Sequence, residues 1–110
     1  MQAKVGKGAV AVIFLNRRNA NDAAGYGAAA EAMEREAAAQ PGYRGIDSVR
    51  GADGTGITVS WWADEAAAQA WRDHAGHSAV RELGRRDWYD AYEVIVAEVT
   101  RSYAWERDPG

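Results

Sequence analysis

The sequence predicts a single α+β domain with a ferredoxin-like, split βαβ arrangement, in which two helices cover one face of a four-stranded antiparallel sheet. Two observations lead to this prediction. Segments typical of strands and helices follow one another in the order strand, helix, strand, strand, helix, strand along the 110 residues. That length suits one domain with one modest core.

The first half of the chain supplies three strands and one helix of this pattern. Residues 8–17 (GAVAVIFLNR) are apolar on both alternating faces, which is typical of a strand in a sheet covered on both sides. Residues 21–42 are rich in alanine and end at Pro41–Gly42, which predicts a helix. Residues 43–62 predict two strands, because Asp53–Gly54 suits the positive φ angles of a hairpin turn.

The second half supplies the remaining helix and strand. Residues 63–76 predict a helix with Gly76 as its break, and a short helical piece is expected in residues 77–86. Residues 88–103 predict a long last strand that is again apolar on both faces. Residues 104–110 are expected to form a frayed tail.

Two helices on one face leave the other face of the predicted sheet bare. Because the first and last strands are apolar on both sides, that bare face would be a patch too large for a monomer. A second copy of the same sheet is the simplest cover, since a two-fold axis buries the same patch on both subunits. The sequence therefore predicts a homodimer whose sheets face each other and that encloses a cavity for a small molecule.

The composition restricts the classes of partner. The formal net charge of −3 argues against nucleic acids and anionic membranes, which favour a positive surface. The chain has no cysteine, which excludes disulfides, thiolate nucleophiles and zinc–thiolate sites. The apolar run AVAVIFL (9–15) is too short for a membrane span and has no signal-peptide cleavage site after it, so a cytoplasmic location is expected.

Three stretches carry a resemblance to a known family. They are QPGYRG before a strand, ITVSWWADEAAAQAW across a strand-to-helix junction, and RRDWYDAYEVIVAEV at the end. The chain resembles the antibiotic biosynthesis monooxygenase domains, small dimeric α/β barrels, over roughly residues 9–103, which is also the expected core of the single domain. The shared motifs concern packing, so they indicate a fold more closely than a reaction. The resemblance implies one of several kinds of protein: a cofactor-independent oxygenase of polycyclic phenols and quinols, a haem-degrading monooxygenase, a non-oxidative isomerase, or a member without a known activity.

The haem-degrading branch implied by the resemblance uses an Asn on the first strand, a Trp on the second main helix, and a His ten residues after that Trp. Asn16 and Trp71 match the first two. Arg81 stands at the third position, and an arginine cannot ligate iron because it stays protonated. His77 would reach the iron only if the chain after Gly76 took a different path.

The two histidines, His74 and His77, lie in the stretch AWRDHAGHSA. His74 shares a predicted helix face with Trp71, so it is either a core-edge histidine near a helix end or a catalytic group. His77 follows the predicted break, where it is either a cap or a general base. A metal site built from both lacks a third ligand, and no metal is expected.

The predicted site comprises seven residues. We assign the base to His77, an anion-stabilising amide to Asn16, and the shaping of the pocket to Trp71. Asn16 could equally be a turn residue that opens NRRNAN. The residues expected to contact a substrate are Phe14, Trp62, His74 and Arg81. Arg50, like Arg81, could bind an acidic substrate or lie solvated on the surface.

These observations favour a monooxygenase-like enzyme that needs no cofactor and acts on a small aromatic or quinol-type molecule. The deprotonated substrate would itself supply the electrons to oxygen, so the protein must remove a proton, hold the anion and exclude water. Three alternatives remain open. They are a haem-binding or haem-degrading enzyme of the same fold, a non-enzymatic dimer that binds a small ligand, and an isomerase or dehydratase that consumes no oxygen.

Overall fold

The computed structural model describes residues 5–109, without the side chains of residues 75–78. Within that part, the elements are β1 (Val10–Arg18), α1 (Ala23–Ala38), β2 (Tyr43–Arg50), β3 (Thr55–Trp62), α2 (Glu65–Arg72), α3 (Ala75–Leu83), a π-helical turn η1 (Gly84–Trp88) and β4 (Tyr89–Glu98). Their order is the predicted one, but α2 is shorter than the helix predicted over 63–76, and α3 with η1 extends over 75–88 where a short piece was expected in 77–86.

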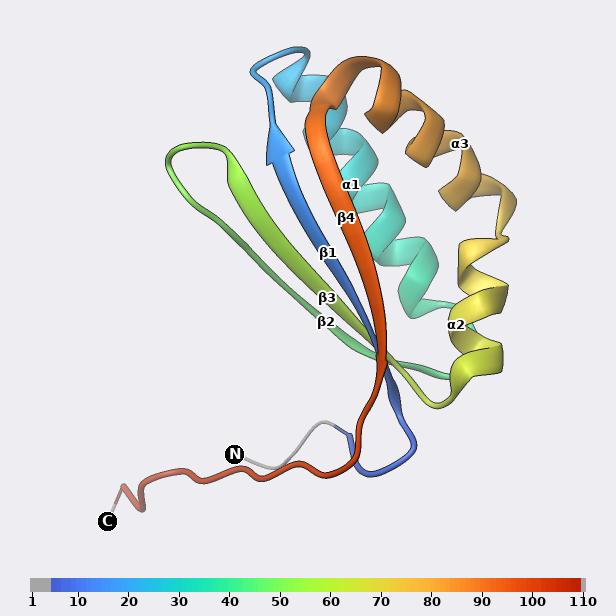
Figure 1. Ribbon diagram of the computed structural model, residues 1–110, viewed down its shortest axis with the longest axis vertical. Coiled ribbons are helices and arrows are strands. Elements are labelled where there is room, and N and C mark those ends of the chain that lie inside the picture. The colour runs from blue at the N-terminus through green and yellow to red at the C-terminus, as the bar shows by residue number, and fades with distance from the viewer. Residues whose placement is uncertain (1–4, 110) are drawn as a thin grey trace.

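The strands form an antiparallel sheet in the order β2-β3-β1-β4, and the helices lie on one side of it (Figure 1). The two strands that are adjacent in sequence form a hairpin, whereas β1 lies between β3 and β4. This is the split βαβ order, so the predicted ferredoxin-like α+β fold is confirmed.

The break between the second and third helices differs from the prediction. α2 ends at Arg72, and α3 starts at Ala75, so the backbone of Gly76 lies in the first turn of α3 rather than at a break. The amide of His74 donates to the carbonyl of Trp71 (3.1 Å), so a tight turn follows α2 at His74, two residues before the predicted break at Gly76. The position of the break follows from packing, because Trp71 at the end of α2 is buried in the core. A glycine in the first turn of α3 lowers the stability of that helix only slightly.

The last strand also ends earlier than the predicted residue 103. Beyond Glu98 the pairing continues for one residue, since the Val99 amide donates to the Ala9 carbonyl (2.8 Å). Residues 100–109 then have no regular structure and leave the foot of the sheet on the side away from α2 (Figure 1). Tyr103 and Trp105 in this tail are 83% and 72% exposed.

The buried core lies at one end of the sheet, beside the start of β1. Trp62 is fully buried, and its ring stacks on Trp71 with 6.0 Å between ring centroids. The Trp62 indole N–H donates to the Ser60 hydroxyl (2.9 Å), so its polar atom is satisfied. Val10 of β1 and Ala37 of α1 pack against the same cluster.

The face of the sheet without helices is apolar across all four strands described. Residues paired across the strands share a face, and alternate positions along β1 point to opposite sides. The large apolar side chains that the register assigns to the helix-free face are Ile13, Leu15, Val49, Ile57, Val59, Trp61 and Ile95. Val49 and Ile57 are among the exposed ones. The expected bare apolar face is therefore present in this chain.

The helix lengths bear on membrane association. Among the described residues, no helix combines the length and the apolar character that crossing a bilayer requires. α1 has 16 residues and carries charged side chains in its second half.

Candidate functional site

The helix-facing side of the sheet carries an unusual row of residues at the end opposite the core. The register aligns Arg50 of β2 with Gly56 of β3, Gly56 with Asn16 of β1, and Asn16 with Tyr92 of β4. Paired residues point to the same side, so this row forms a polar strip beneath the helices. We call these four residues the polar row.

The two rows next to the polar row are mixed rather than apolar. They consist of Ser48, Thr58, Phe14 and Val94, followed by Ile46, Ser60, Val12 and Val96. Val94 and Val96 remain 50% and 52% exposed although the register assigns them to the helix side. The helix layer therefore leaves the β4 edge of the sheet uncovered, with apolar side chains beside the polar row.

Asn16 presents a free hydrogen-bond acceptor in this region. Its side chain is buried, and its Nδ2 donates to the Gly56 carbonyl at a long distance of 3.4 Å. That carbonyl fixes the orientation of the amide, because the reverse orientation would place two oxygens against each other. Oδ1 then has no hydrogen-bond partner among the described residues. A buried acceptor without a partner costs about 1–3 kcal/mol, which is typical of a site that a ligand completes.

Three aromatic rings cluster where the polar row crosses β1 and β4. The ring of Phe14 lies 5.2 Å from that of Tyr89 and 5.4 Å from that of Tyr92, measured between centroids. The Tyr92 hydroxyl accepts a hydrogen bond from Nε of Arg85 (2.6 Å), which raises the pKa of that guanidinium. Glu82 binds the same arginine at 3.2 Å. Tyr92 is thereby fixed beside Asn16.

Tyr89 is a phenol that stays protonated. Burial raises its pKa above the ordinary value, and a hydrogen bond with the Tyr26 hydroxyl adds to the shift. The rings of the two tyrosines meet edge to face at 6.0 Å. Tyr89 can therefore donate a proton or a hydrogen bond, but it is not a base at neutral pH.

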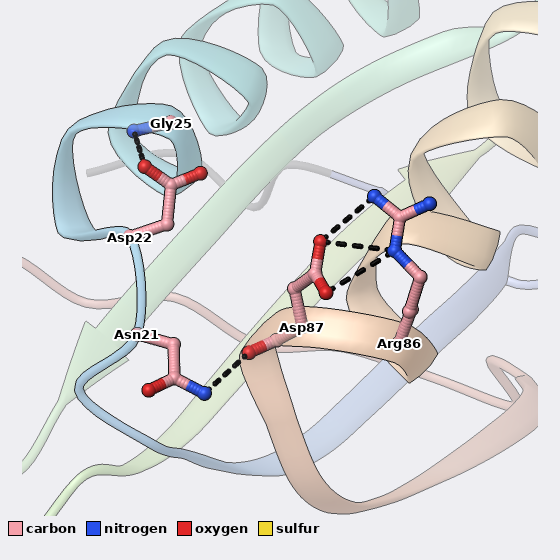
Figure 2. A network of polar contacts seen from close by, with 5 residues as sticks. All are labelled: Asn21, Asp22, Gly25, Arg86 and Asp87. Carbon is pink, nitrogen blue, oxygen red and sulfur yellow. Dashed lines mark hydrogen bonds and ion pairs between the residues drawn. The ribbon is translucent and has the colours of Figure 1, made fainter.

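The loop between β1 and α1 is tied to η1 beside the polar row. Asn21 Nδ2 donates to the carbonyl of Asp87 (3.2 Å), and Asp87 pairs with Arg86 at 2.9 Å (Figure 2). Asp22 adopts a left-handed conformation (φ 47°), and its carboxylate caps α1 by accepting from the amide of Gly25. The contact between Asn21 and Asp87 holds the start of α1, whose first turns carry Tyr26, beside η1, which leads into β4.

The structure separates the predicted site residues into two groups. On the helix-facing side, Asn16 belongs to the polar row and Phe14 lies in the next row. Trp62 and Trp71 lie in the buried core, and His74 packs on Trp71 at 5.2 Å. Val10, which contacts the core tryptophans, precedes Asn16 by six residues, a distance of about 20 Å along a strand. Asn16 and the tryptophan cluster thus lie toward opposite ends of the sheet.

The remaining predicted residues lie on the second and third helices. His74 Nδ1 is 3.8 Å from Glu36 Oε2, and both side chains are partly exposed at the core end. Arg81 is half-buried, and its Nε has no hydrogen-bond partner within the described part of the chain. The side chain of His77 lies outside the described residues, although its backbone belongs to α3.

The residues that the resemblance relates to haem do not fit that group here. Trp71 is only 7% exposed inside the core, toward the end of the sheet opposite Asn16, and Arg81 stands where a histidine would be needed. Among the residues whose side chains are described, no three His, Asp or Glu groups are arranged to hold a metal ion.

Sequence reasoning missed Tyr26, Gly56 and Tyr92 as site residues. A signal was present in the hairpin, where the apolar residues Val49, Ile57 and Val59 alternate with polar or small ones. With the apolar set on the helix-free face, period two places Arg50 and Gly56 beneath the helices. The proximity of Tyr26 to this row needs the tertiary structure, because 24 residues separate it from Arg50.

Comparison with known proteins agrees with this fold. The family model of antibiotic biosynthesis monooxygenases matches residues 9–83. The uncharacterized protein YqjZ of Bacillus subtilis is 48% identical over 98 residues, which cover 89% of this chain and 85% of that protein. SnoaB of Streptomyces nogalater, a cofactor-independent oxygenase, superposes with a TM-score of 0.68 at 15% identity, over 93% of this chain and 98% of its own. Rv0793 of Mycobacterium tuberculosis superposes with a TM-score of 0.70 at 18% identity, over 93% of this chain and 99% of its own. The chain belongs to the antibiotic biosynthesis monooxygenase family.

Proposed function

We propose that this protein is a cofactor-independent monooxygenase of a small aromatic phenol, bound between the sheet and the helices beside the polar row. The observation that carries this proposal is the buried Oδ1 of Asn16, an acceptor without a partner in the described part of the chain, next to Phe14 and the uncovered Val94. An aromatic ring with a hydroxyl group complements such a surface, because the ring buries against the apolar residues and the hydroxyl donates to Oδ1. Family membership supports the reaction class.

The proposed reaction needs only the phenol and oxygen. Removal of the phenolic proton makes the ring carbon opposite the oxygen electron-rich, and that carbon bonds to O₂ to give a peroxide. Loss of the remaining C–H proton and cleavage of the O–O bond leave a new carbonyl and release water. One phenol and one O₂ thus give one quinone and one water, and the four electrons that reduce O₂ all come from the substrate.

The three residues predicted to be catalytic keep roles in this proposal, beside Phe14 as a substrate contact. His77 is assigned the base, and burial raises the pKa of Tyr89, so that this phenol does not serve as a base at neutral pH. Asn16 holds the neutral phenol by accepting a hydrogen bond from its hydroxyl, a role that suits its free atom better than the stabilisation of an oxyanion. The hydroxyl turns from Oδ1 to the base before its proton is removed. Trp71 acts indirectly, by anchoring α2 to the sheet.

Oxygen consumption with 1-naphthol as the probe tests the reaction. We expect uptake of O₂ with formation of 1,4-naphthoquinone, and isotopically labelled O₂ should place one oxygen atom in the quinone and one in water. His77→Ala should lower kcat on the order of 100-fold, with His74→Ala as the matched control. If naphthols raise the thermal stability but are recovered unchanged with no uptake of O₂, the protein is a ligand-binding dimer and the oxygenase proposal fails.

We further infer that the helix-free face of the sheet packs on the same face of a second copy. The exposed Val49, Ile57 and Ile95 support this inference, since one identical apolar patch on each subunit suits a two-fold axis. Light scattering should give twice the mass of the chain for the native protein. Ile57→Lys should give the single mass, whereas Glu31→Lys on α1 should leave the dimer intact. A native monomer at all concentrations would contradict the inference.

A further inference from the structure

Two arginines converge on one tyrosine at the edge of the polar row. The guanidinium carbon of Arg18 lies 3.7 Å from the centre of the Tyr26 ring, and that of Arg50 lies 5.6 Å from it. Nη2 of Arg50 also donates to the Tyr26 hydroxyl (2.9 Å). The three side chains come from the end of β1, the end of β2 and the start of α1, so the fold brings them together from distant positions in the sequence.

Neither guanidinium has an acidic partner in the described part of the chain. Arg18 donates through Nη2 to the carbonyl of Asn21 (3.0 Å), and its Nε is buried without a partner. Arg50 donates through Nη1 to the carbonyl of Gly54 (2.6 Å). By contrast, Arg72, Arg85 and Arg86 each pair with a carboxylate at 3.2 Å or less. Two cations held against one ring without a counter-charge favour the binding of an anion between them.

A glycine brings Arg50 close to Asn16. A Cβ atom on Gly56 would lie 2.8 Å from the Arg50 guanidinium carbon, so the guanidinium rests directly on this glycine. The Gly56 carbonyl is the acceptor for Asn16 Nδ2. The cationic pair, the free Asn16 oxygen and the Phe14 ring therefore lie along one side of the sheet, in adjacent rows.

We propose that Arg18 and Arg50 bind the carboxylate of an aromatic acid whose ring lies over Phe14 and whose hydroxyl reaches Asn16. A guanidinium presents two parallel N–H donors that match the two oxygens of a carboxylate, and stacking on Tyr26 holds the donors in place. This inference rests on the proposed function for the position of the ring, and it assigns the substrate to the class of hydroxylated aromatic carboxylic acids. The anion subsite itself is independent of any turnover.

Calorimetric titration with 1-hydroxy-2-naphthoate and its neutral analogue 1-naphthol tests the subsite. We expect the acid to bind about tenfold more tightly than the naphthol, and more weakly as salt is added. Arg18→Met and Arg50→Met should each remove this preference and leave the binding of 1-naphthol unchanged. Arg72→Met, which removes an arginine paired with Asp73, is the matched control and should change neither affinity.

Several outcomes separate the subsite from the reaction. Equal affinity for acid and naphthol in the native protein, unaffected by Arg18→Met or Arg50→Met, would overturn the subsite and leave the oxygenase proposal standing. Competition by inorganic phosphate at the same concentration as the naphthoate would indicate a general anion site and would overturn the carboxylate assignment. Tight, arginine-dependent binding of the acid without uptake of O₂ would support the subsite and contradict the oxygenase. Circular dichroism checks that each variant is folded.

Discussion

The two ends of the helix-facing side of the sheet differ in how completely they are packed. At the core end, Trp62 is fully buried, stacks on Trp71 and has its indole N–H satisfied by Ser60. At the other end, the buried Oδ1 of Asn16 has no partner among the described residues, and Val94 on the neighbouring strand is half-exposed. The same strand, β1, contributes Val10 to the first end and Asn16 to the second.

This difference separates stability from function within one layer. The core end buries apolar surface, which is the main favourable contribution to folding. The polar row and its neighbours offer an acceptor without a partner, two arginines without an acidic partner among the described residues, and an open apolar edge, which suit a ligand better than they suit packing. Substitutions at the core end should therefore lower stability, and substitutions at the polar row should change binding with little loss of stability.

Substitution of Trp62 should have the largest effect on stability, because it disrupts the packing of the core end. Trp62→Ala deletes the centre of the buried cluster, and a loss of about 3–5 kcal/mol in the free energy of unfolding is expected. Urea denaturation followed by circular dichroism measures this loss. Trp105→Ala in the exposed tail is the matched control and should change the stability by less than about 0.5 kcal/mol.

The pH dependence of stability should report on the burial of Tyr89. Its pKa is raised in the folded chain, so above pH 10 the unfolded chain loses the phenolic proton first and the free energy of unfolding falls as the pH rises. The slope should stay well below the limit of about 1.4 kcal/mol per pH unit, because Tyr89 is partly exposed. Urea denaturation at several pH values from about 8 to about 11 measures this slope. Tyr89→Phe should flatten this fall, and an equal fall in both proteins would contradict the explanation.

Replacement of Asn16 by leucine should separate the effect on stability from the effect on binding, because leucine fills a similar volume and removes the unsatisfied acceptor. We expect Asn16→Leu to leave the free energy of unfolding unchanged or to raise it by about 1 kcal/mol, while binding of 1-naphthol is lost. Chemical denaturation and calorimetric titration measure the two effects. A destabilised variant that still binds 1-naphthol would show that Asn16 contributes to stability and not to binding.

Gly56→Ala should have the smallest effect on stability and a selective effect on binding. The new methyl group would displace the Arg50 guanidinium, whose flexible side chain can move at a cost below about 1 kcal/mol. Titration should show a weaker affinity for 1-hydroxy-2-naphthoate and an unchanged affinity for 1-naphthol. Gly27→Ala is the control, since nothing lies within 4 Å of the new atom; it should stabilise α1 by about 0.5–1 kcal/mol and leave binding unaltered.

Much of the fold follows from local patterns. The alternation in residues 8–17 and the Asp53–Gly54 turn predicted three strands correctly, because side-chain period and turn chemistry are local properties. The break after α2 did not follow, since a glycine signal at Gly76 was outweighed by the packing of Trp71. Asn16 was identified as a candidate from its amide and from its match to the first-strand Asn of the haem-degrading branch, and the structure adds that its Oδ1 has no partner among the described residues.

The sequence by itself determined the order of the elements, the family and the apolar helix-free face, because these depend on periodicity and on short motifs. Only the tertiary structure decided which residues meet. It assigned Trp62 and Trp71 to the core and joined Arg18, Tyr26 and Arg50 beside Asn16. The physical reason is that strand register and helix placement bring together residues that are distant along the chain, and no local pattern encodes those distances.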